Sequence, residues 1–575
     1  MAYFLKKSKI KNGLYLQIYF SYRDPETKQP KNKSVRSLGY FHKLQEEGIE
    51  DPIAHFQLEV DQMNEEFKKE KARNKTREIT SVSPVKSLGY FPLKSILDGL
   101  NVKKDIDMFQ FFTKQDYSLA EALEALVFSR AVNPCSKHRT SESVIPSLYG
   151  DYSFSYDQIL SACEMLGLHY EKIVEILTAA VAKKYGIDTS VTYFDCTNFY
   201  FEIDLQDSLR RKGMSKENRK DPIVGMSLLL DADCIPIGMR IYPGNQSEKP
   251  EIRNLIGDMK MQNNITGKTV QVADKGLNCA ENIYKARKGN DGYLFSKSVK
   301  MLSEKELDWV FNDETMHEVR DSNGELLYAY KSCVDTFEYS FKIAETGEKK
   351  TFKTKEKRIV TFNPSLARKK LIEIDKMADK AAKGCLYHAK KSEFGEAAKY
   401  ITVSSVDING QENGEKAVAS VNREAISRDR MFAGYNMLVT SEIKMKDQEI
   451  YDTYHNLWRI EESFRTMKSE LDARPVYLQN HDRIRGHFLI CYAAVLLTRI
   501  FQIKILKDKF GTHQIFELFR EFKVLEVSER KYVNTSVMTD LLKTISRTYG
   551  IPVCNYHMSK GDIKKVLGYR LTPML

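Results

Sequence analysis

The stretch VTYFDCTNFYFEI, residues 191–203, decides the fold, because its β-branched and aromatic residues predict the first strand of a sheet. Similar runs downstream predict four more strands, and two helices alternate with the last of them. The strands are GMSLLLDA (225–232), IPIGMRIYP (235–243), TVQVAD (269–274) and GYLFSKS (292–298), and the helices span 251–261 and 280–288. Three strands in succession, followed by alternating helix and strand, are typical of a mixed sheet with helices on its faces.

The rest of the chain is arranged around this sheet as an α+β multidomain protein. Before residue 44, alternating apolar residues predict a small sheet, and a charged helix at 53–71 and a polar linker at 72–83 follow. Helical periodicity dominates from 93 to 185. We therefore predict five parts: a small β-sheet plus helix (1–80), a helical subdomain (81–188), the mixed sheet with its helices (189–298 and 445–507), a mostly β insertion (299–444) and a helical tail (508–575).

The net charge, the cysteine spacing and the apolar runs of the chain indicate which classes of protein it can belong to. The chain has 575 residues and a net charge of +11, which favours polyanionic partners. Its nine cysteines include no C-x-x-C pair, so neither a disulfide framework nor a zinc site is predicted. The N-terminus lacks the apolar core of a signal peptide, and the longest apolar run, Phe488–Leu497, is too short to span a bilayer. We expect a cytoplasmic protein with reduced thiols.

The stretch YHNLWRIEESFRTMKSEL, residues 454–471, contains no helix breaker and predicts one amphipathic helix. Its apolar stripe, which should be buried, comprises Leu457, Ile460, Phe464, Met467 and Leu471. A second stripe, roughly 90° round the helix, comprises Tyr454, Trp458, Glu461, Arg465, Lys468 and Asp472. Glu461 therefore lies at the seam with neighbouring elements, where a site could use it, and Glu462 is expected to be solvated. A surface helix with i,i+4 charge pairs is the ordinary alternative.

Two aspartates stand at or near the ends of predicted strands. Asp195 is expected at or near the end of the first strand, and Asp274 closes TVQVAD. Aspartates at such places often cap turns or helices, but Asn278 and Glu281 already form a capping-box-like start for the next helix, which leaves Asp274 available. Together with Glu461, these carboxylates are the oxygen ligands that a pair of Mg²⁺ ions requires for phosphoryl chemistry, and Mn²⁺ would substitute. The carboxylates that compete for the same role are Glu202, Asp204, Asp231, Asp233 and Glu462.

The motifs resemble those of bacterial insertion-sequence transposases with a DDE catalytic triad and a YREK-like signature. Tyr454, Glu461 and Lys468 match three of the four signature places, and Leu457 holds the place of the arginine. WRIEE, which contains Arg459, matches the core of that helix in some relatives. FDCT resembles the first aspartate motif, VADKGL the second, and RKGMSKENRKDP (211–222) a basic loop of the branch with large insertions.

The resemblance implies an RNase H-like fold for 189–298 and 445–507, with Asp195, Asp274 and Glu461 holding two metal ions. It implies phosphate contacts for Tyr454 and Lys468, with Arg459 and Arg465 as further candidates beside the missing arginine. Asn436 stands where hairpin-forming relatives place a stacking tryptophan, and the adjacent Tyr435 is a candidate to replace it. The basic loop should contact DNA through Arg210, Arg211, Lys212, Lys216, Arg219 and Lys220.

The leading hypothesis is a transposase that binds the terminal inverted repeats of its element as double-stranded DNA, cleaves them and joins the 3′-OH ends to target DNA. A homodimer in a synaptic complex is implied, with DNA-end binding assigned to 1–80 or 81–188 and dimerisation to 508–575. Two alternatives stay open: a nuclease of the same fold without strand transfer, and an inactive relative that acts as a DNA-binding regulator. Clustered carboxylates would repel a phosphate backbone, which argues against a pure DNA binder.

Overall fold

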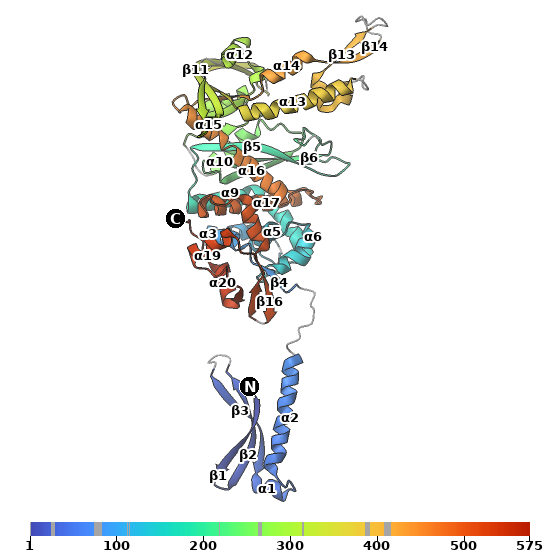
Figure 1. Ribbon diagram of the computed structural model, residues 1–575, viewed down its shortest axis with the longest axis vertical. Coiled ribbons are helices and arrows are strands. Elements are labelled where there is room, and N and C mark those ends of the chain that lie inside the picture. The colour runs from blue at the N-terminus through green and yellow to red at the C-terminus, as the bar shows by residue number, and fades with distance from the viewer. Residues whose placement is uncertain are drawn as a thin grey trace. The chain divides into compact units, whose positions relative to one another are not determined.

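The computed structural model describes residues 2–24, 29–73, 83–111, 113, 115–217, 219–262, 267–312, 316–344, 346–385, 391–406, 416–528 and 530–574. These residues form two compact units, Met1–Ser83 and Pro84–Leu575 (Figure 1). Most of the predicted linker, 74–82, lies outside the described residues. The division between the two units falls between Ser83 and Pro84.

The N-terminal unit is the predicted small sheet with its helix. The strands β1 (Ala2–Ile10), β2 (Gly13–Arg23) and β3 (Pro30–Tyr40) form an antiparallel meander, followed by α1 (Phe41–Glu46) and α2 (Pro52–Arg73). Alternation along β2 turns Leu16 and Ile18 inward, where they pack with residues of α1 and α2. The buried core consists of Leu5, Leu16, Ile18, Leu44, Phe56 and Val60.

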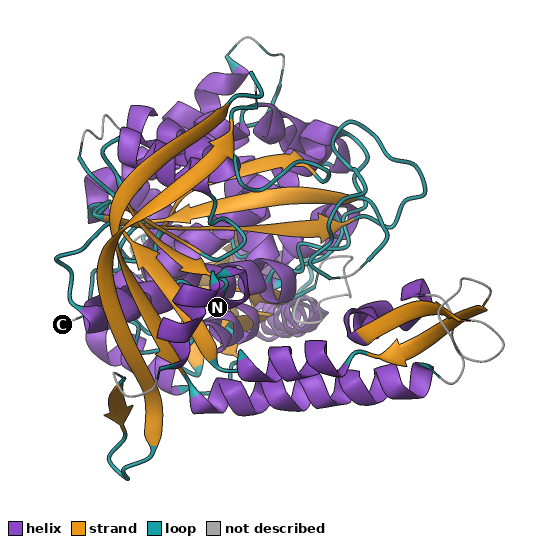
Figure 2. Cartoon of the chain, turned by 90° about the horizontal axis from the view of Figure 1, so that it is seen from above, coloured by secondary structure: helices purple, strands orange, loops and turns teal. Residues whose placement is uncertain are grey.

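The larger unit is built on a nine-stranded mixed sheet with the order β10-β11-β12-β15-β9-β8-β5-β6-β7. All five predicted core strands are present: β5 (Val191–Tyr200), β6 (Ile223–Leu230), β7 (Pro236–Pro243), β8 (Val270–Ala273) and β9 (Gly292–Lys297). β5 is antiparallel to β6 and parallel to β8, and β8 is parallel to β9. Figure 2 shows helices packed around this sheet. The helices α10 (Glu251–Gln262) and α11 (Ala280–Lys288) lie between the core strands in the chain.

The predicted insertion extends this sheet instead of standing apart from it. The chain leaves β9 through α12 (Glu304–Phe311) and adds β10 (His317–Arg320), β11 (Leu326–Lys342) and β12 (Lys349–Phe362). β15 (Tyr435–Thr440) then pairs with both β12 and β9, which returns the chain to the core. Outside the sheet lie α13 (Pro364–Gly384), α14 (Arg423–Met431), and the paired β13 (Ile401–Val406) and β14 (Lys416–Val421).

A helical layer covers one face of the sheet. It contains α3 (Phe91–Leu100), α5 (Leu119–Val132), α8 (Tyr156–Leu168), α9 (Tyr170–Tyr185) and the buried helix α17 (His481–Arg499). The segment His481–Ile505 is long and apolar enough to cross a membrane, but 89% of its most apolar window is buried inside the protein. These helices share one hydrophobic core with the sheet, so the 81–188 block packs as part of the larger unit.

The C-terminal tail is only partly helical. It contains α18 (Thr512–Glu521), α19 (Asp540–Tyr549) and α20 (Lys560–Gly568), together with β16 (Lys523–Ser528), β17 (Lys531–Asn534) and β18 (His557–Ser559). These strands form a sheet in the order β18-β17-β16-β4, in which β4 (Val85–Ser87) comes from the start of the unit. The tail, expected to be helical, contains these strands because β16 pairs both with the neighbouring β17 and with β4, which lies more than 400 residues away in sequence.

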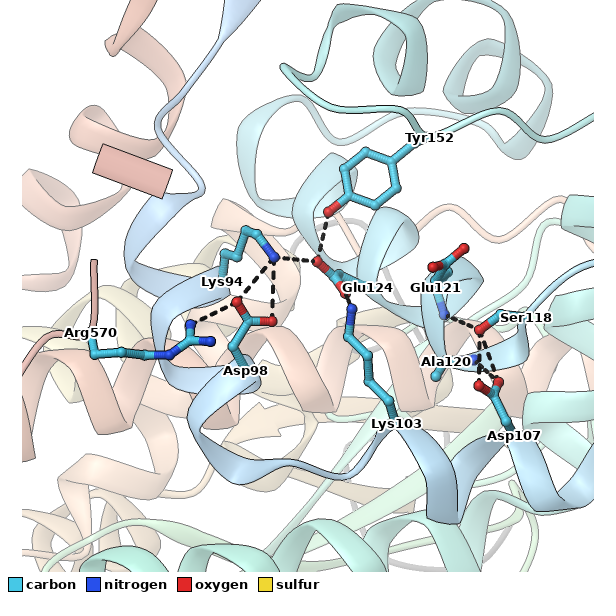
Figure 3. Close-up of polar contacts among 10 residues, drawn as sticks. All are labelled: Lys94, Asp98, Lys103, Asp107, Ser118, Ala120, Glu121, Glu124, Tyr152 and Arg570. Carbon is cyan, nitrogen blue, oxygen red and sulfur yellow. Dashed lines mark hydrogen bonds and ion pairs between the residues drawn. The ribbon is translucent and has the colours of Figure 1, made fainter. Parts of the chain in front are cut away.

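A buried ion-pair network holds the C-terminus to the helical layer (Figure 3). Glu124 on α5 is 1% exposed, and its carboxylate meets Lys94 Nζ at 3.2 Å, Lys103 Nζ at 2.6 Å and the Tyr152 hydroxyl at 2.6 Å. Lys94 also pairs with Asp98, which accepts a 2.7 Å bond from Arg570 near the C-terminus. The network thus joins α3, α5 and the last residues of the chain.

Candidate active site

The register of β5 and β8 brings Asp195 and Asp274 together. Phe194 pairs with Ala273 in this parallel ladder, so Asp195 and Asp274 occupy the next pair of positions. Alternation along β5 places Asp195 on the same face as Tyr193 and Phe199, which belong to the core shared with the helical layer, while Phe194 and Cys196 pack on the opposite face. Two carboxylates from neighbouring strands therefore lie on one face of the sheet.

Asp195 has the perturbed electrostatics of a functional carboxylate. Burial, with smaller contributions from the negative charges of Glu248 and Asp274, raises the pKa of Asp195 to about 6. Lys216 and the backbone N–H of Cys196, which donates to Asp195 Oδ1 at 2.7 Å, oppose this shift. Lys216 Nζ lies 3.7 Å from Asp195 and 3.5 Å from Glu248, so a cation already stands between these two carboxylates.

The segment 454–471, predicted to be one continuous helix, is interrupted in the structure. α15 (Asp447–His455) ends before a turn at Asn456 and Leu457, α16 (Trp458–Arg465) begins after it, and 466–470 is π-helical. At this turn the backbone hydrogen bonds run to the third preceding residue and not to the fourth, as they would in an α-helix. The N–H of Leu457 donates to the carbonyl of Tyr454, and the N–H of Arg459 donates to the carbonyl of Asn456. The predicted apolar stripe is nevertheless buried: Leu457, Ile460, Phe464, Met467 and Leu471 are at most 7% exposed.

Tyr454 connects this helical segment to the aspartates. Its hydroxyl donates to Asp274 Oδ1 at 3.2 Å, and burial, followed by the charge of Asp274, raises the pKa of Tyr454. The negative charge of Glu461 acts on the same hydroxyl. The expected capping box beside Asp274 is absent, because Asn278 Nδ2 donates to the carbonyl of Ser296 and the helix begins after Cys279 without a side-chain cap.

The two adjacent glutamates of α16 differ in exposure. Glu462 was expected to be solvated, but it is partly buried. Glu462 is 16% exposed, pairs with buried Arg499 at 3.0 Å and accepts a 2.7 Å bond from Thr512. Glu461 is exposed on the other side of the helix. Within the described ranges, no three His, Cys, Asp or Glu side chains are gathered closely enough to hold a metal ion, so Glu461 does not complete a ligand set with the aspartates in this conformation.

Lys468, a predicted phosphate contact, is held by an acidic residue of the basic loop. Its ammonium lies 3.1 Å from Glu217, which also pairs with Arg474. Lys468 Nζ stands 5.5 Å from the centre of the Phe199 ring on β5. Glu217 and Glu248 are therefore residues of the site that the sequence patterns missed; the only available signal was an acidic residue inside an otherwise basic loop.

The other predicted contacts divide into exposed and internally paired residues. Arg459 pairs with Glu462 and Asp508 and is 17% exposed, whereas Arg465 is exposed. In the basic loop, Arg210 is buried against Asp207 and Gln479, so it is not positioned to contact DNA. Arg219 stacks on Tyr200, with its guanidinium 3.7 Å from the ring centre. The remaining loop cations, all exposed, are Arg211, Lys212, Lys216 and Lys220.

Tyr435 lies beside a basic cavity next to the second aspartate. Its ring packs against Phe362 and Phe311, with centroid distances of 4.9 and 5.2 Å, so both rings restrict stacking by a base. The cavity has a volume of about 480 Å³ and is lined by Lys275, Lys297, Lys300, Lys369 and Lys370. Asn436 also lines it and accepts a hydrogen bond from Ser296.

Comparison with known proteins gives a match in the N-terminal unit. Residues 5–77 match the family described as IS1634 family transposase, N-terminal domain. The match supports an insertion-sequence transposase. No curated protein matches the chain.

A transposase acts on DNA, and the N-terminal unit carries basic residues on its third strand. Two of them are internally paired, Lys31 with Asp24 and Arg36 with Glu59 at 2.5 Å. Lys33, on the same strand, is exposed. The paired Lys31 and Arg36 are themselves half exposed, so the third strand keeps a basic surface.

Proposed function

We propose that this chain is a DDE transposase whose reaction centre is formed by Asp195, Asp274 and Glu461 on an RNase H-like sheet. The main support for this proposal is the parallel register of β5 and β8, in which Asp195 and Asp274 occupy neighbouring positions on the face of the sheet that α16 contacts. The strand order β7-β6-β5-β8-β9, with only β6 running against the other four, supports the RNase H-like assignment.

The donor set suits Mg²⁺, since both strand residues offer carboxylate oxygens. Lys216, which now pairs with Asp195, would have to withdraw to admit the ion. When bound, Mg²⁺ would activate the attacking oxygen and stabilise the leaving oxygen. Asp195 and Asp274 would hold it, and Tyr454 would fix the orientation of Asp274 through its hydroxyl. Glu461 would complete the ligands after a change in its rotamer or in α16.

The remaining residues would position DNA. Lys468 and Arg474 lie on one side of the aspartates and can meet phosphates if Glu217 withdraws. In the first step a water oxygen bonds to phosphorus and the P–O3′ bond breaks, which leaves a 3′-OH and a 5′-phosphate. In the second step that 3′-OH attacks a target phosphodiester and displaces another 3′ oxygen. We further propose a homodimer that holds two element ends, acting in the cytoplasm on the bacterial chromosome.

The test uses DNA that carries the inverted repeats flanking the gene. Asp195→Asn, Asp274→Asn and Glu461→Gln should each abolish Mg²⁺-dependent cleavage and leave binding of the repeats largely intact. Asp204→Asn and Glu202→Gln change exposed carboxylates of the same region and should cleave normally. Cleavage that survives all three site substitutions would refute the assignment. Precut ends then separate a transposase, which joins them to target DNA, from a nuclease, which does not.

A further inference from the structure

A second polar site lies away from the aspartates, where α5, α6 (Lys137–Arg139) and α17 meet (Figure 1). It is a cavity of about 200 Å³ whose wall includes Arg130, Lys137 and His487. These three side chains are 6%, 7% and 4% exposed. Two cations are thus buried together in the wall of one cavity, which is costly unless an anion compensates them.

His487 is a neutral acceptor between these cations. Its Nε2 faces the carbonyl oxygen of Ala473 at 3.1 Å, so Nε2 carries the proton and donates. Its Nδ1 then accepts, and both Arg130 Nη2 and Lys137 Nζ approach it at 3.4 Å. Burial and the two neighbouring cations hold the pKa of His487 well below its ordinary value, which agrees with this neutral form.

The donors of the cluster outnumber its acceptors. Lys137 carries three N–H donors and Arg130 five. The acceptors recorded for them are His487 Nδ1 and the carbonyl oxygen of Leu471, the latter at 3.4 Å from Arg130. Burial and the charge of Arg130 lower the pKa of Lys137 to about 8, as expected for a cation without a carboxylate partner.

The only carboxylate on the cavity wall is that of Asp472, which is exposed and forms no ion pair with Arg130 or Lys137 within the described part of the chain. Tyr156 and Tyr477, 39% and 73% exposed, stand on the same wall. The cavity therefore combines a buried cationic floor with exposed aromatic side chains that can contact the group attached to an anion.

We propose that this cavity, formed around Arg130, Lys137 and His487, is a binding site for a phosphate group. Phosphate fits because its oxygens can accept several bonds at once, and the guanidinium fork of Arg130 matches such an oxygen pair. The phosphate is either a free ion or part of a DNA backbone. This proposal does not depend on the proposed catalytic function. The experiment that tests it measures phosphate binding, and none of the residues of the site belongs to the aspartate centre.

The first measurement is calorimetric titration of inorganic phosphate into the full chain at constant ionic strength. Saturable binding is expected in the wild-type protein, and its absence would overturn the proposal. Lys137→Met keeps the length of the side chain, removes the buried charge and should weaken phosphate binding at least about tenfold. Lys183→Met, an exposed lysine on α9, is the matched control and should bind as the wild type does.

A second arm identifies the source of the phosphate. A duplex oligonucleotide is titrated into the same three proteins in phosphate-free buffer. If Lys137→Met alone binds the oligonucleotide more weakly, the site holds a phosphate of the DNA backbone. If Lys137→Met loses phosphate binding but keeps its affinity for the oligonucleotide, the site holds a free phosphate ion. Equal phosphate affinity in all three proteins would refute the site. If Lys137→Met does not fold, Arg130→Gln replaces it under the same criteria.

Discussion

At the scale of single residues, Glu217 is the carboxylate that restrains the predicted phosphate contacts. It neutralises Lys468 and Arg474 in the absence of DNA. Glu217→Gln removes this charge, so we expect DNA affinity to rise by about fivefold, which corresponds to roughly 1 kcal/mol. Fluorescence anisotropy with labelled repeat DNA measures it. Glu470→Gln, which removes a partner of Arg520, makes the same change in charge and should give a smaller increase.

Asp231, one of the competing carboxylates, is a structural residue whose charge destabilises the fold. It is fully buried in the β6–β7 turn, and its Oδ1 accepts a 2.8 Å bond from the N–H of Ile235. Burial raises the pKa of Asp231 to about 7. The folded state therefore holds the proton more tightly than the unfolded state, so the stability contributed by this group is complete below about pH 4 and is lost as pH rises to about 7.

Asp231→Asn should abolish this pH-dependent loss. Between pH 5 and pH 8 the free energy of unfolding of the wild type should fall by about 2–3 kcal/mol more than that of the variant. Urea unfolding followed by tryptophan emission at both pH values measures the difference. Asp233→Asn alters the half-exposed neighbour in the same turn and should follow the wild type; an equal pH response in all three proteins would contradict the role of Asp231.

At the scale of residues, the helical period correctly predicted the buried apolar stripe of 454–471 but not the surroundings of its glutamates, since Glu461 is exposed and Glu462, expected to be solvated, is partly buried. Asp195, expected at or near a strand end, lies inside β5, and the β5–β8 register brings it next to Asp274. The partners of Glu462 were not predictable, because Arg499 and Thr512 reach it through tertiary packing. Leu457 is buried in the core, so its hydrophobic character, instead of a contact with DNA, explains its place on the helix.

At the scale of elements, α5 depends on the buried carboxylate of Glu124. Glu124→Ala would leave Lys94, Lys103 and the Tyr152 hydroxyl without their shared acceptor (Figure 3). Because the two lysines remain partly exposed, we expect a loss of about 2–3 kcal/mol in the free energy of unfolding, below the range for fully buried pairs. Glu121→Ala on the exposed side of the same helix should cost less than about 1 kcal/mol. Similar losses in the two variants would show that the network adds no stability.

Most elements were predictable because their patterns are local, and the exceptions have identifiable causes. The five core strands alternate or run continuously apolar, and α11 matches its predicted bounds. β16 to β18 have short, half-exposed patterns and become strands through pairing with one another and with β4. The break at Asn456 has no glycine or proline to announce it, so the sequence predicted one helix where two are present.

At the scale of the whole molecule, the order of the segments along the chain was easier to predict than whether each segment forms a separate domain. The helical block and the insertion were expected to stand apart, yet their residues join the core and the sheet of one large unit. Such merging depends on contacts between distant segments, such as α17 with α5 and α8, which no local pattern reports. Only the division near residue 83 coincides with a change in composition.

The two units should unfold separately, and the chain contains a natural probe for one of them. Both tryptophans, Trp309 and Trp458, belong to the larger unit, so their emission does not report on Met1–Ser83. The N-terminal unit has a small core, and small cores give low stability. We therefore expect circular dichroism to detect an early transition in urea that tryptophan emission misses. Ile18→Ala should move only this transition, by about 2–4 kcal/mol, and Ile545→Ala in α19 should move only the tryptophan transition. A shift of both transitions by either substitution would mean that the two units unfold as one cooperative body.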